Sequence, residues 1–335
     1  MSVGTTGDLA VAYSLRQRNS DLKAEVQKLN EELTTGIAAD LTKHLGGSFA
    51  RLSSVERDMR ILDGFKISIA EATQYSEAVQ LRLSEIADMS QSFGGDLLTA
   101  TAANGAAAPV NIAAEARMHF ETVVATMNTQ SAGRSLFAGD ASDRAALIDS
   151  ADILDEIRTV VGGLTDPVDI RDAIDTWFDD PAGFELFAYR GSATAIAPFR
   201  MSDTIEIGVD VRANDPAIRD VLRTLSYAAI SDDTAISLAP IEEMELLRSA
   251  AEGLLTAQER IIGLQSSVGL AQEQITGWSV RNASERIGTE YAKSALLQVD
   301  PYETATRLEA AQFQMQSLYT VTVRLSQLSL VNFLR

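Results

Sequence analysis

Residues 247–278 read LRSAAEGLLTAQERIIGLQSSVGLAQEQITGW, and apolar side chains recur in this stretch with a heptad period. Five apolar residues follow one another at seven-residue steps, and another apolar residue comes three positions after each of them. This pattern is typical of a coiled coil, in which two helices bury a shared apolar seam. We predict one continuous helix over residues 240–297, about 80 Å long at 1.5 Å per residue. Its seam comprises Leu247, Ala250, Leu254, Ala257, Ile261, Leu264, Val268, Ala271, Ile275 and Trp278.

Both ends of the chain carry apolar stripes with similar spacing. They predict one helix over residues 8–35 and another from Asp300 to Arg335, where Asp300 caps the helix and Pro301 takes its first position. Chain ends are usually polar and frayed, so these stripes need a covering surface, either the opposite terminus or neighbouring copies. The predicted assembly interface consists of Leu15, Leu22, Val26, Leu29, Leu33, Leu308, Ala311, Met315, Leu318, Leu325, Leu328 and Phe333.

Between these ends the sequence predicts a second long helix and a more irregular middle. Apolar residues at three- and four-residue steps predict a helix over 48–98, with Ser53 and Glu56 as a capping box. Residues 101–109 are predicted to form a turn, and a shorter helix follows at about 110–131. The doublet Gly94-Gly95 is interpreted as a helix end.

The middle of the chain predicts short helices and two short strands. The pairs Asp166-Pro167 and Asp215-Pro216 are typical helix starts. They predict helices near 168–178 and 215–230, and another is expected at 150–163, ending at Gly162-Gly163. Two segments alternate apolar and polar residues as half-buried strands do, namely residues 184–190 and 204–211.

The predicted fold is mainly α: a long antiparallel coiled-coil rod formed by the N- and C-terminal segments, with a small α+β insert in the middle. Residues 1–40 and 299–335 would form a terminal coiled-coil domain. Residues 41–138 and 240–298 would form a helical rod domain, and residues 139–239 the insert.

Composition narrows the partners and the compartment. The net charge of −19, without any run of Lys or Arg, disfavours nucleic acid and anionic membrane surfaces. The chain has no cysteine, so disulfides and thiolate chemistry are excluded. The first residues lack the basic and apolar regions of a secretory signal, and no apolar run has the length of a membrane span. An exported protein of this kind would leave without a cleaved leader.

The sequence predicts no catalytic, cofactor or metal site. His44 and His119 are the only histidines, and each is interpreted as a lone helix-face residue. The acidic stretch Asp172–Asp180 lacks the spacing of a calcium loop, and Glu242-Glu243 is one of many carboxylate pairs expected by chance. Phosphate-binding loops and nucleophile motifs do not occur.

Three passages of this sequence resemble the flagellin family of bacterial flagella. Residues 29–36, LNEELTTG, resemble the end of the family's first helix, and residues 133–140, GRSLFAGD, resemble the point where junction proteins leave the helical rod. Residues 299–308, VDPYETATRL, with 325–335, LSQLSLVNFLR, are similar to its C-terminal helix. Residues 38–47, AADLTKHLGG, depart from the pattern of filament subunits, which favours a hook–filament junction protein, the third hook-associated protein.

The resemblance implies an extracellular structural subunit without enzymatic activity. Such subunits form a ring of identical copies between a neighbouring hook-associated protein on the hook side and flagellin on the filament side. They are exported through the flagellar type III apparatus after release from a chaperone. Alternatives stay open: a filament flagellin, an intracellular coiled-coil adaptor or signalling module, or, more remotely, an enzyme with its site inside residues 140–240.

Overall fold

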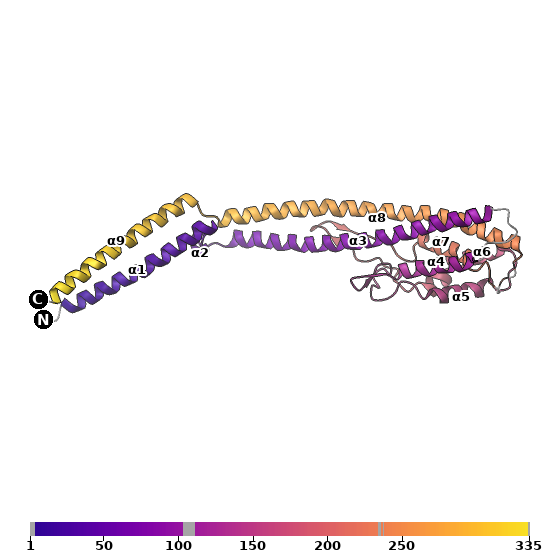
Figure 1. The fold of residues 1–335 in the computed structure, drawn as a ribbon, viewed down its shortest axis with the longest axis horizontal. Coiled ribbons are helices and arrows are strands. Elements are labelled where there is room, and N and C mark those ends of the chain that lie inside the picture. The colour runs from indigo at the N-terminus through magenta and orange to yellow at the C-terminus, as the bar shows by residue number, and fades with distance from the viewer. Residues whose placement is uncertain (1–3, 103–110, 234–235, 237, 334–335) are drawn as a thin grey trace. The chain divides into compact units, whose positions relative to one another are not determined.

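The computed structural model describes residues 4–102, 111–233, 236 and 238–333 of the 335-residue chain. The chain is mainly helical and divides into two compact units (Figure 1). Unit 1 contains Met1–Asp63 and Ala283–Arg335, and unit 2 contains Gly64–Asn282. Two long helices contribute to both units: α3 (Ala50–Ala102) and α8 (Pro240–Leu297).

Unit 1 pairs the two ends of the chain. Its helices α1 (Gly4–Thr35) and α9 (Pro301–Phe333) lie side by side, and a short helix, α2 (Leu41–His44), follows α1. Backbone hydrogen bonds join the segments next to the pair: the Ala38 amide donates to the Leu297 carbonyl at 2.9 Å, and the Val299 amide donates to the Gly36 carbonyl at 3.0 Å. Gly36 has φ +71°, a conformation that glycine adopts without steric cost, and it ends α1.

The helix starts follow the capping rules read from the sequence. The Asp300 carboxylate accepts hydrogen bonds from the amides of Tyr302 at 2.8 Å and Glu303 at 3.1 Å, which confirms it as the cap of α9. Asp166 and Asp215 likewise cap α6 (Pro167–Asp179) and α7 (Pro216–Ala229).

In unit 2, α3 and α8 pack against each other in antiparallel directions. A Cβ added at Gly94 of α3 would lie 3.3 Å from the Leu254 Cβ of α8. Three residues earlier in α3, Gln91 accepts a hydrogen bond at 3.4 Å from Gln258, which lies four residues later in α8. The two helices therefore run in opposite directions. The shared apolar core continues into the insert. Buried on the α8 side are Leu247, Ala250, Leu254, Ala257, Ile261, Val268, Ala271 and Ile275, while Leu264 and Trp278 are half-buried.

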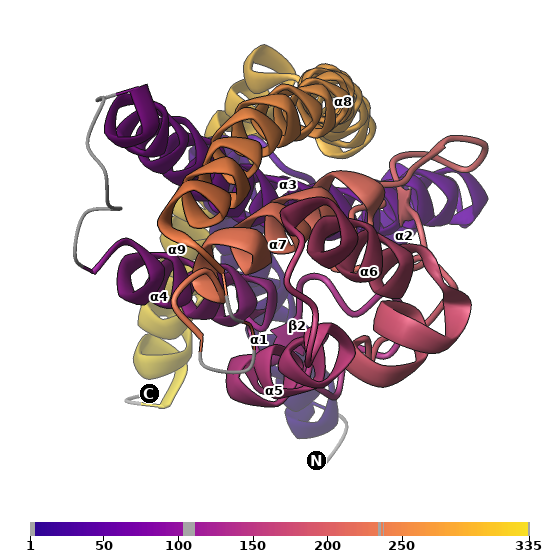
Figure 2. The same cartoon turned by 90° about the vertical axis from the view of Figure 1, so that its right-hand side faces the viewer.

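The remaining elements of unit 2 gather beside these helices (Figure 2). Helix α4 (Ile112–Met127) leads into the hairpin of β1 (Gln130–Ser131) and β2 (Arg134–Ser135). Then come α5 (Ser150–Val161), α6 and a short helical segment, η1 (Pro181–Ala188), which is kinked at Gly183. Strands β3 (Phe199–Arg200) and β4 (Glu206–Ile207) pair in antiparallel directions before α7.

The strand predicted over residues 184–190 is wrong, because most of this segment is the helical η1. Asp180 caps η1 by accepting from the Ala182 amide, and Pro181 provides a favourable first residue. Phe184 then stacks on Phe178 of α6 with ring centroids 5.3 Å apart. The tertiary contact therefore overrides the alternating pattern. In residues 204–211 only Glu206–Ile207 pairs as a strand, although Ile207, Val209 and Val211 are all buried.

Two further local predictions are wrong. Ser53 does not start a helix, because α3 already begins at Ala50. Gly94-Gly95 lies inside α3 rather than at its end, and Gly94 leaves room for Leu254 of α8. The turn predicted at residues 101–109 lies mostly outside the described residues.

Candidate functional site: the terminal helix pair

The contact between α1 and α9 is centred on a small apolar cluster. Leu29 of α1 and Leu308 and Ala311 of α9 are buried, and Val26 packs against them. The Arg307 guanidinium pairs with the Glu25 carboxylate at 3.3 Å at the edge of this cluster. On the other side, the buried Glu32 carboxylate accepts a hydrogen bond from the Ala39 amide at 3.1 Å. Apolar burial thus holds the pair near the C-terminal end of α1 and the N-terminal end of α9, and polar contacts flank the cluster.

The predicted interface residues fall into four groups. Leu29, Leu308 and Ala311 are buried between the two helices. Leu33 is 42% exposed, although it belongs to the same predicted stripe as Leu29. The side chains of Leu325, Leu328 and Phe333 lie outside the described residues. The half-buried members are Leu15, Leu22, Val26, Met315 and Leu318.

Both terminal helices also expose large apolar side chains that the sequence analysis did not single out. Phe313 is 71% and Tyr13 is 73% exposed, and the other members of this set are Val11, Tyr319, Val321 and Val323. Scattered apolar residues are ordinary on a surface, and α3 and α8 expose others, such as Ile67 and Ile287. In α9, however, Tyr319, Val321 and Val323 lie within five residues of one another. The sequence signal was available: aromatic and β-branched residues lie between the heptad positions, where a solvated helix usually has polar ones.

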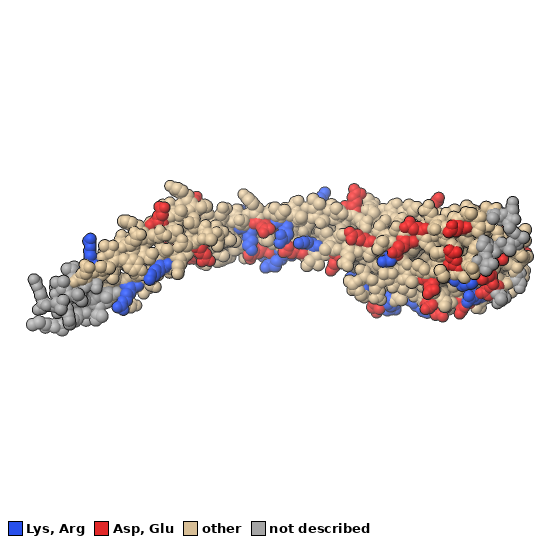
Figure 3. Space-filling view, in the orientation of Figure 1, with Lys and Arg blue, Asp and Glu red and all other residues tan. Residues whose placement is uncertain are grey.

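Charge is divided unequally between the two units. Unit 1 has 13 Lys and Arg residues and 14 Asp and Glu residues, whereas unit 2 has 15 and 33. All but one of the 19 net negative charges therefore lie in unit 2. Acidic side chains outnumber basic ones over unit 2 in the face shown in Figure 3. Copies of a nearly neutral unit 1 can approach one another with little repulsion, whereas copies of unit 2 repel.

In unit 1, two ion pairs set the register of α3 against α8. The Lys293 ammonium lies 2.9 Å from the Glu56 carboxylate, and Arg286 Nε lies 2.7 Å from Asp63 Oδ1. The second pair is seven residues further along α3 and seven residues back along α8, as an antiparallel coiled coil requires. Both pairs are partly exposed and contribute little stability, so their main effect is on alignment.

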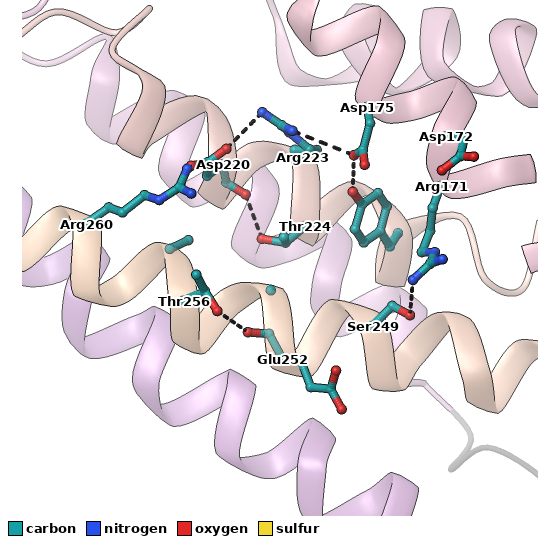
Figure 4. Close-up of a pocket in the computed structure, with 13 residues that line it drawn as sticks. Arg171, Asp172, Asp175, Asp220, Arg223, Thr224, Ser249, Glu252, Thr256 and Arg260 are labelled. Atoms are coloured by element: carbon teal, nitrogen blue, oxygen red, sulfur yellow. Dashed lines mark hydrogen bonds and ion pairs between the residues drawn. The ribbon is translucent and has the colours of Figure 1, made fainter. Parts of the chain in front are cut away.

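A polar pocket of about 440 Å³ lies in unit 2 among α6, α7 and α8 (Figure 4). The Asp220 carboxylate at its wall pairs with Arg223 at 2.8 Å and also with Arg260 of α8. The Tyr227 hydroxyl donates to Asp175, and burial, followed by this hydrogen bond, raises the pKa of Tyr227 well above its usual value.

These pocket residues bind one another. Arg223 also pairs with Asp179 at 3.1 Å, and Arg171 of α6 donates to the Ser249 hydroxyl of α8 at 3.1 Å. The pocket therefore contains a network that fastens α6 and α7 to α8. None of these residues was singled out by the sequence analysis as a site. Their spacing along the chain, from 171 to 260, gives no local motif that could have found them.

The two histidines belong to different units. His119 of α4 lies beside the Phe93 ring, with centroids 4.6 Å apart, and 3.9 Å from Glu115, whereas His44 lies in α2. Within the part of the chain that the structure describes, no three His, Asp or Glu side chains form a metal-binding group. The described helices include none with an apolar stretch long enough to span a bilayer.

One comparison with known proteins covers the C-terminal part of the chain. Residues 253–334 match the family model of the bacterial flagellin C-terminal helical region. No curated protein matches the sequence. Among solved structures, the chain is similar to one described as a flagellar hook-associated protein from Vibrio parahaemolyticus. That similarity has 12% identity and a TM-score of 0.48, and covers 73% of this chain and 95% of the other. Residues 253–334, which comprise most of α8 and α9, are thus similar to the C-terminal helical region of bacterial flagellin.

Proposed function

We propose that this protein is a structural subunit of the bacterial flagellum that joins the hook to the filament as a ring of identical copies. The observation that carries the proposal is the apolar surface of α9, a helix inside the flagellin-type region, because Phe313, Tyr319, Val321 and Val323 are all exposed. Burial of such side chains stabilises an assembly by about 25 cal/mol per Å² of apolar surface removed from water. Neighbouring copies of the same helix pair are the covering surface.

In this proposal the parts of the chain have separate roles. Residues 1–40 and 299–335 form the inner assembly domain, residues 41–138 and 240–298 the helical rod, and residues 139–239 the outward insert. The charge distribution supports this division, because the nearly neutral unit 1 tolerates close neighbours and the acidic unit 2 favours solvent. The further partners are a hook-associated protein on one side, flagellin on the other, and an export chaperone before secretion.

The competing function within the family is that of filament flagellin. The segment 38–47, which departs from the filament pattern, forms a turn and α2, where Asp40 accepts from the Lys43 amide at 3.0 Å. Purified junction subunits are not expected to polymerise into long filaments, whereas purified flagellin is expected to do so. Sedimentation and electron microscopy over a range of concentrations separate the two.

Deletion of the gene tests the proposal in cells. A junction subunit predicts complete hooks without filaments and flagellin released into the medium, and the intact gene should restore filaments. Filaments of normal number and length in the deletion strain would contradict a role in the flagellum. Loss of the filament protein itself, with no flagellin in the medium, would instead assign the chain to the filament.

A further inference from the structure

The glycines of α8 are of two kinds. At Gly253, an added Cβ would lie 2.4 Å from the Thr224 Cγ2 of α7, so close packing of the two helices excludes a side chain. At Gly263, Gly269, Gly277 and Gly288, an added Cβ would meet nothing within 4 Å. Glycine inside a helix is less stable than alanine because it loses more backbone freedom on folding. These four glycines therefore lower the stability of α8, and no close packing against another helix requires them.

Their positions lie outside the apolar seam. Gly263 and Gly277 each come two residues after a seam residue, Ile261 and Ile275 respectively, and both are exposed. A helix former of any size fits such a position. Four open glycines within 26 residues of one helix consequently concentrate weak points in a single stretch.

Packing becomes sparse in the same stretch. Seven residues of α8 are buried within 246–261, whereas only four are buried in the 36 residues 262–297. The first part of α8 is also held by the insert, through Arg260 with Asp220 and through Ser249 with Arg171. Low burial and weak helix propensity are the properties of segments that open at low free energy.

We propose that residues 262–288 of α8 form a compliant segment. Its open glycines let the helix bend and open locally, while the first part of α8 stays fixed against α7. Within the proposed function, this compliance lets one subunit fit neighbours that are not placed identically. The incorporation of the subunit into the flagellum then depends on these glycines.

The chain has no cysteine, so two introduced cysteines, Glu259→Cys and Ser294→Cys, would be the only sites that take a spin label. The distance between the two labels can then be measured in the full chain. Both positions are exposed, and a straight helix places them about 52 Å apart. We expect a broad distance distribution in the native sequence. In the variant with Gly263, Gly269, Gly277 and Gly288 all replaced by Ala, the distribution should narrow, and amide exchange near each site should slow about two- to fivefold. An unchanged width and unchanged exchange would overturn the proposal.

Gly253→Ala is the matched control. It adds the same methyl group to the same helix but meets Thr224, so it should speed amide exchange in α7 and α8 and leave the distance distribution broad. Slower exchange in this variant as well would contradict the distinction between packed and open glycines.

Complementation of a deletion strain then tests the link to assembly. The native gene should restore filaments, and the four-alanine variant, although folded and secreted, should restore several-fold fewer. Equal restoration would show that compliance has no role in incorporation. Failure of the native gene to restore any phenotype would count against the proposed function, whereas the spin-label result would still decide the compliance of α8.

Discussion

Leu29 of α1 and Leu308 of α9 lie in one buried cluster, with exposed fractions of 1% and 8%. This contact joins the two ends of the chain within a single molecule, and few other described side chains of α1 and α9 are buried with it. A terminal pair held at one cluster is weak, because helices of this kind depend on packing for their stability. Under the proposed function, the pair is suited to replace this contact by contacts with neighbouring copies.

Leu29→Ala is expected to separate the terminal pair without unfolding unit 2. The substitution removes a fully buried side chain and should lower the stability of the α1–α9 contact by about 2–3 kcal/mol. Amide exchange in both helices should accelerate, while the thermal unfolding of unit 2 should not change. Leu33→Ala, at a 42% exposed position of the same helix, serves as control and should have little effect. Equal effects of the two variants would argue against the cluster.

Phe313→Asp should block assembly while leaving the monomer intact. Phe313 is 71% exposed, so the change costs the free chain less than about 0.5 kcal/mol, whereas a buried charge in an assembly is expensive. Leu186→Asp is a matched control, since Leu186 in η1 of the insert is also 71% exposed. We expect filament restoration with Leu186→Asp and its loss with Phe313→Asp, counted by microscopy. Restoration by both variants would exclude α9 from the interface.

Asp220→Ala should destabilise the insert more than Arg260→Ala. The Asp220 side chain is 13% exposed and neutralises two guanidinium groups, whereas Arg260 is 58% exposed. Loss of Asp220 leaves Arg223 short of one partner, at a cost of about 1–3 kcal/mol. Loss of Arg260 removes an ion pair at the surface, with an expected cost of about 0–1 kcal/mol. Urea unfolding measures both when it is followed by the fluorescence of Trp177 in a Trp278→Phe background, because the chain has two tryptophans. The reverse order would contradict the network.

Gly139→Ala should lower the free energy of unfolding more than most substitutions that add a single methyl group. Gly139 has φ +63°, and its added Cβ would lie 2.4 Å from the Thr194 carbonyl oxygen, so strain and a clash combine to about 2–3 kcal/mol. Gly133→Ala is the control, because Gly133 has φ +76° but open space around it, and should cost only about 1 kcal/mol. Thermal unfolding of the two variants compares them, and equal transition temperatures would contradict the clash.

Two tyrosines, the half-buried Tyr75 and the buried Tyr189, predict a loss of stability at high pH. Burial, reinforced by Asp210, raises the pKa of Tyr75 from 10.0 to about 12, and burial likewise raises the pKa of Tyr189 to about 12. The unfolded chain therefore releases these protons first as the pH rises above 10, so the free energy of unfolding falls between pH 10 and about 12. Below pH 10 both groups stay protonated in both states, and their contribution does not change.

Tyr75→Phe tests that pH dependence. The hydroxyl of Tyr75 donates to the Leu136 carbonyl at 2.8 Å, so its loss should cost about 1 kcal/mol at neutral pH. The variant should also lose stability less steeply between pH 10 and 12 than the native chain. Urea unfolding at several pH values gives both quantities. Identical slopes in the two proteins would show that Tyr75 does not titrate on unfolding.

The long helices and their caps could be predicted from the sequence because their signals are local and repeated. The heptads of α8 predict its bounds, and Asp166, Asp215 and Asp300 act on amides two or three residues away. The segment 184–190 could not be predicted in this way, since the Phe184–Phe178 contact decides its conformation.

The terminal site was only partly visible in the sequence. Heptad spacing predicts one apolar stripe on each helix, and Leu29, Leu308 and Ala311 are indeed buried. The spacing does not predict that Leu29 is buried whereas Leu33 is exposed, because the length of the contact depends on how the two helices align. The exposed Phe313 and Tyr13 lie outside the stripe. Only the folded helix pair shows which side of each helix is buried between α1 and α9 and which side stays exposed.

Assembly through the terminal helices can be tested by amide hydrogen exchange, measured on the dilute full chain and on the same protein within isolated flagella. Gly4–Thr35 and Pro301–Phe333 should exchange much faster than the core of unit 2 in the monomer, and should become protected by at least tenfold in the flagellum. Protection of both segments in the dilute monomer at the level of the unit 2 core, with no further gain on assembly, would contradict assembly through these helices.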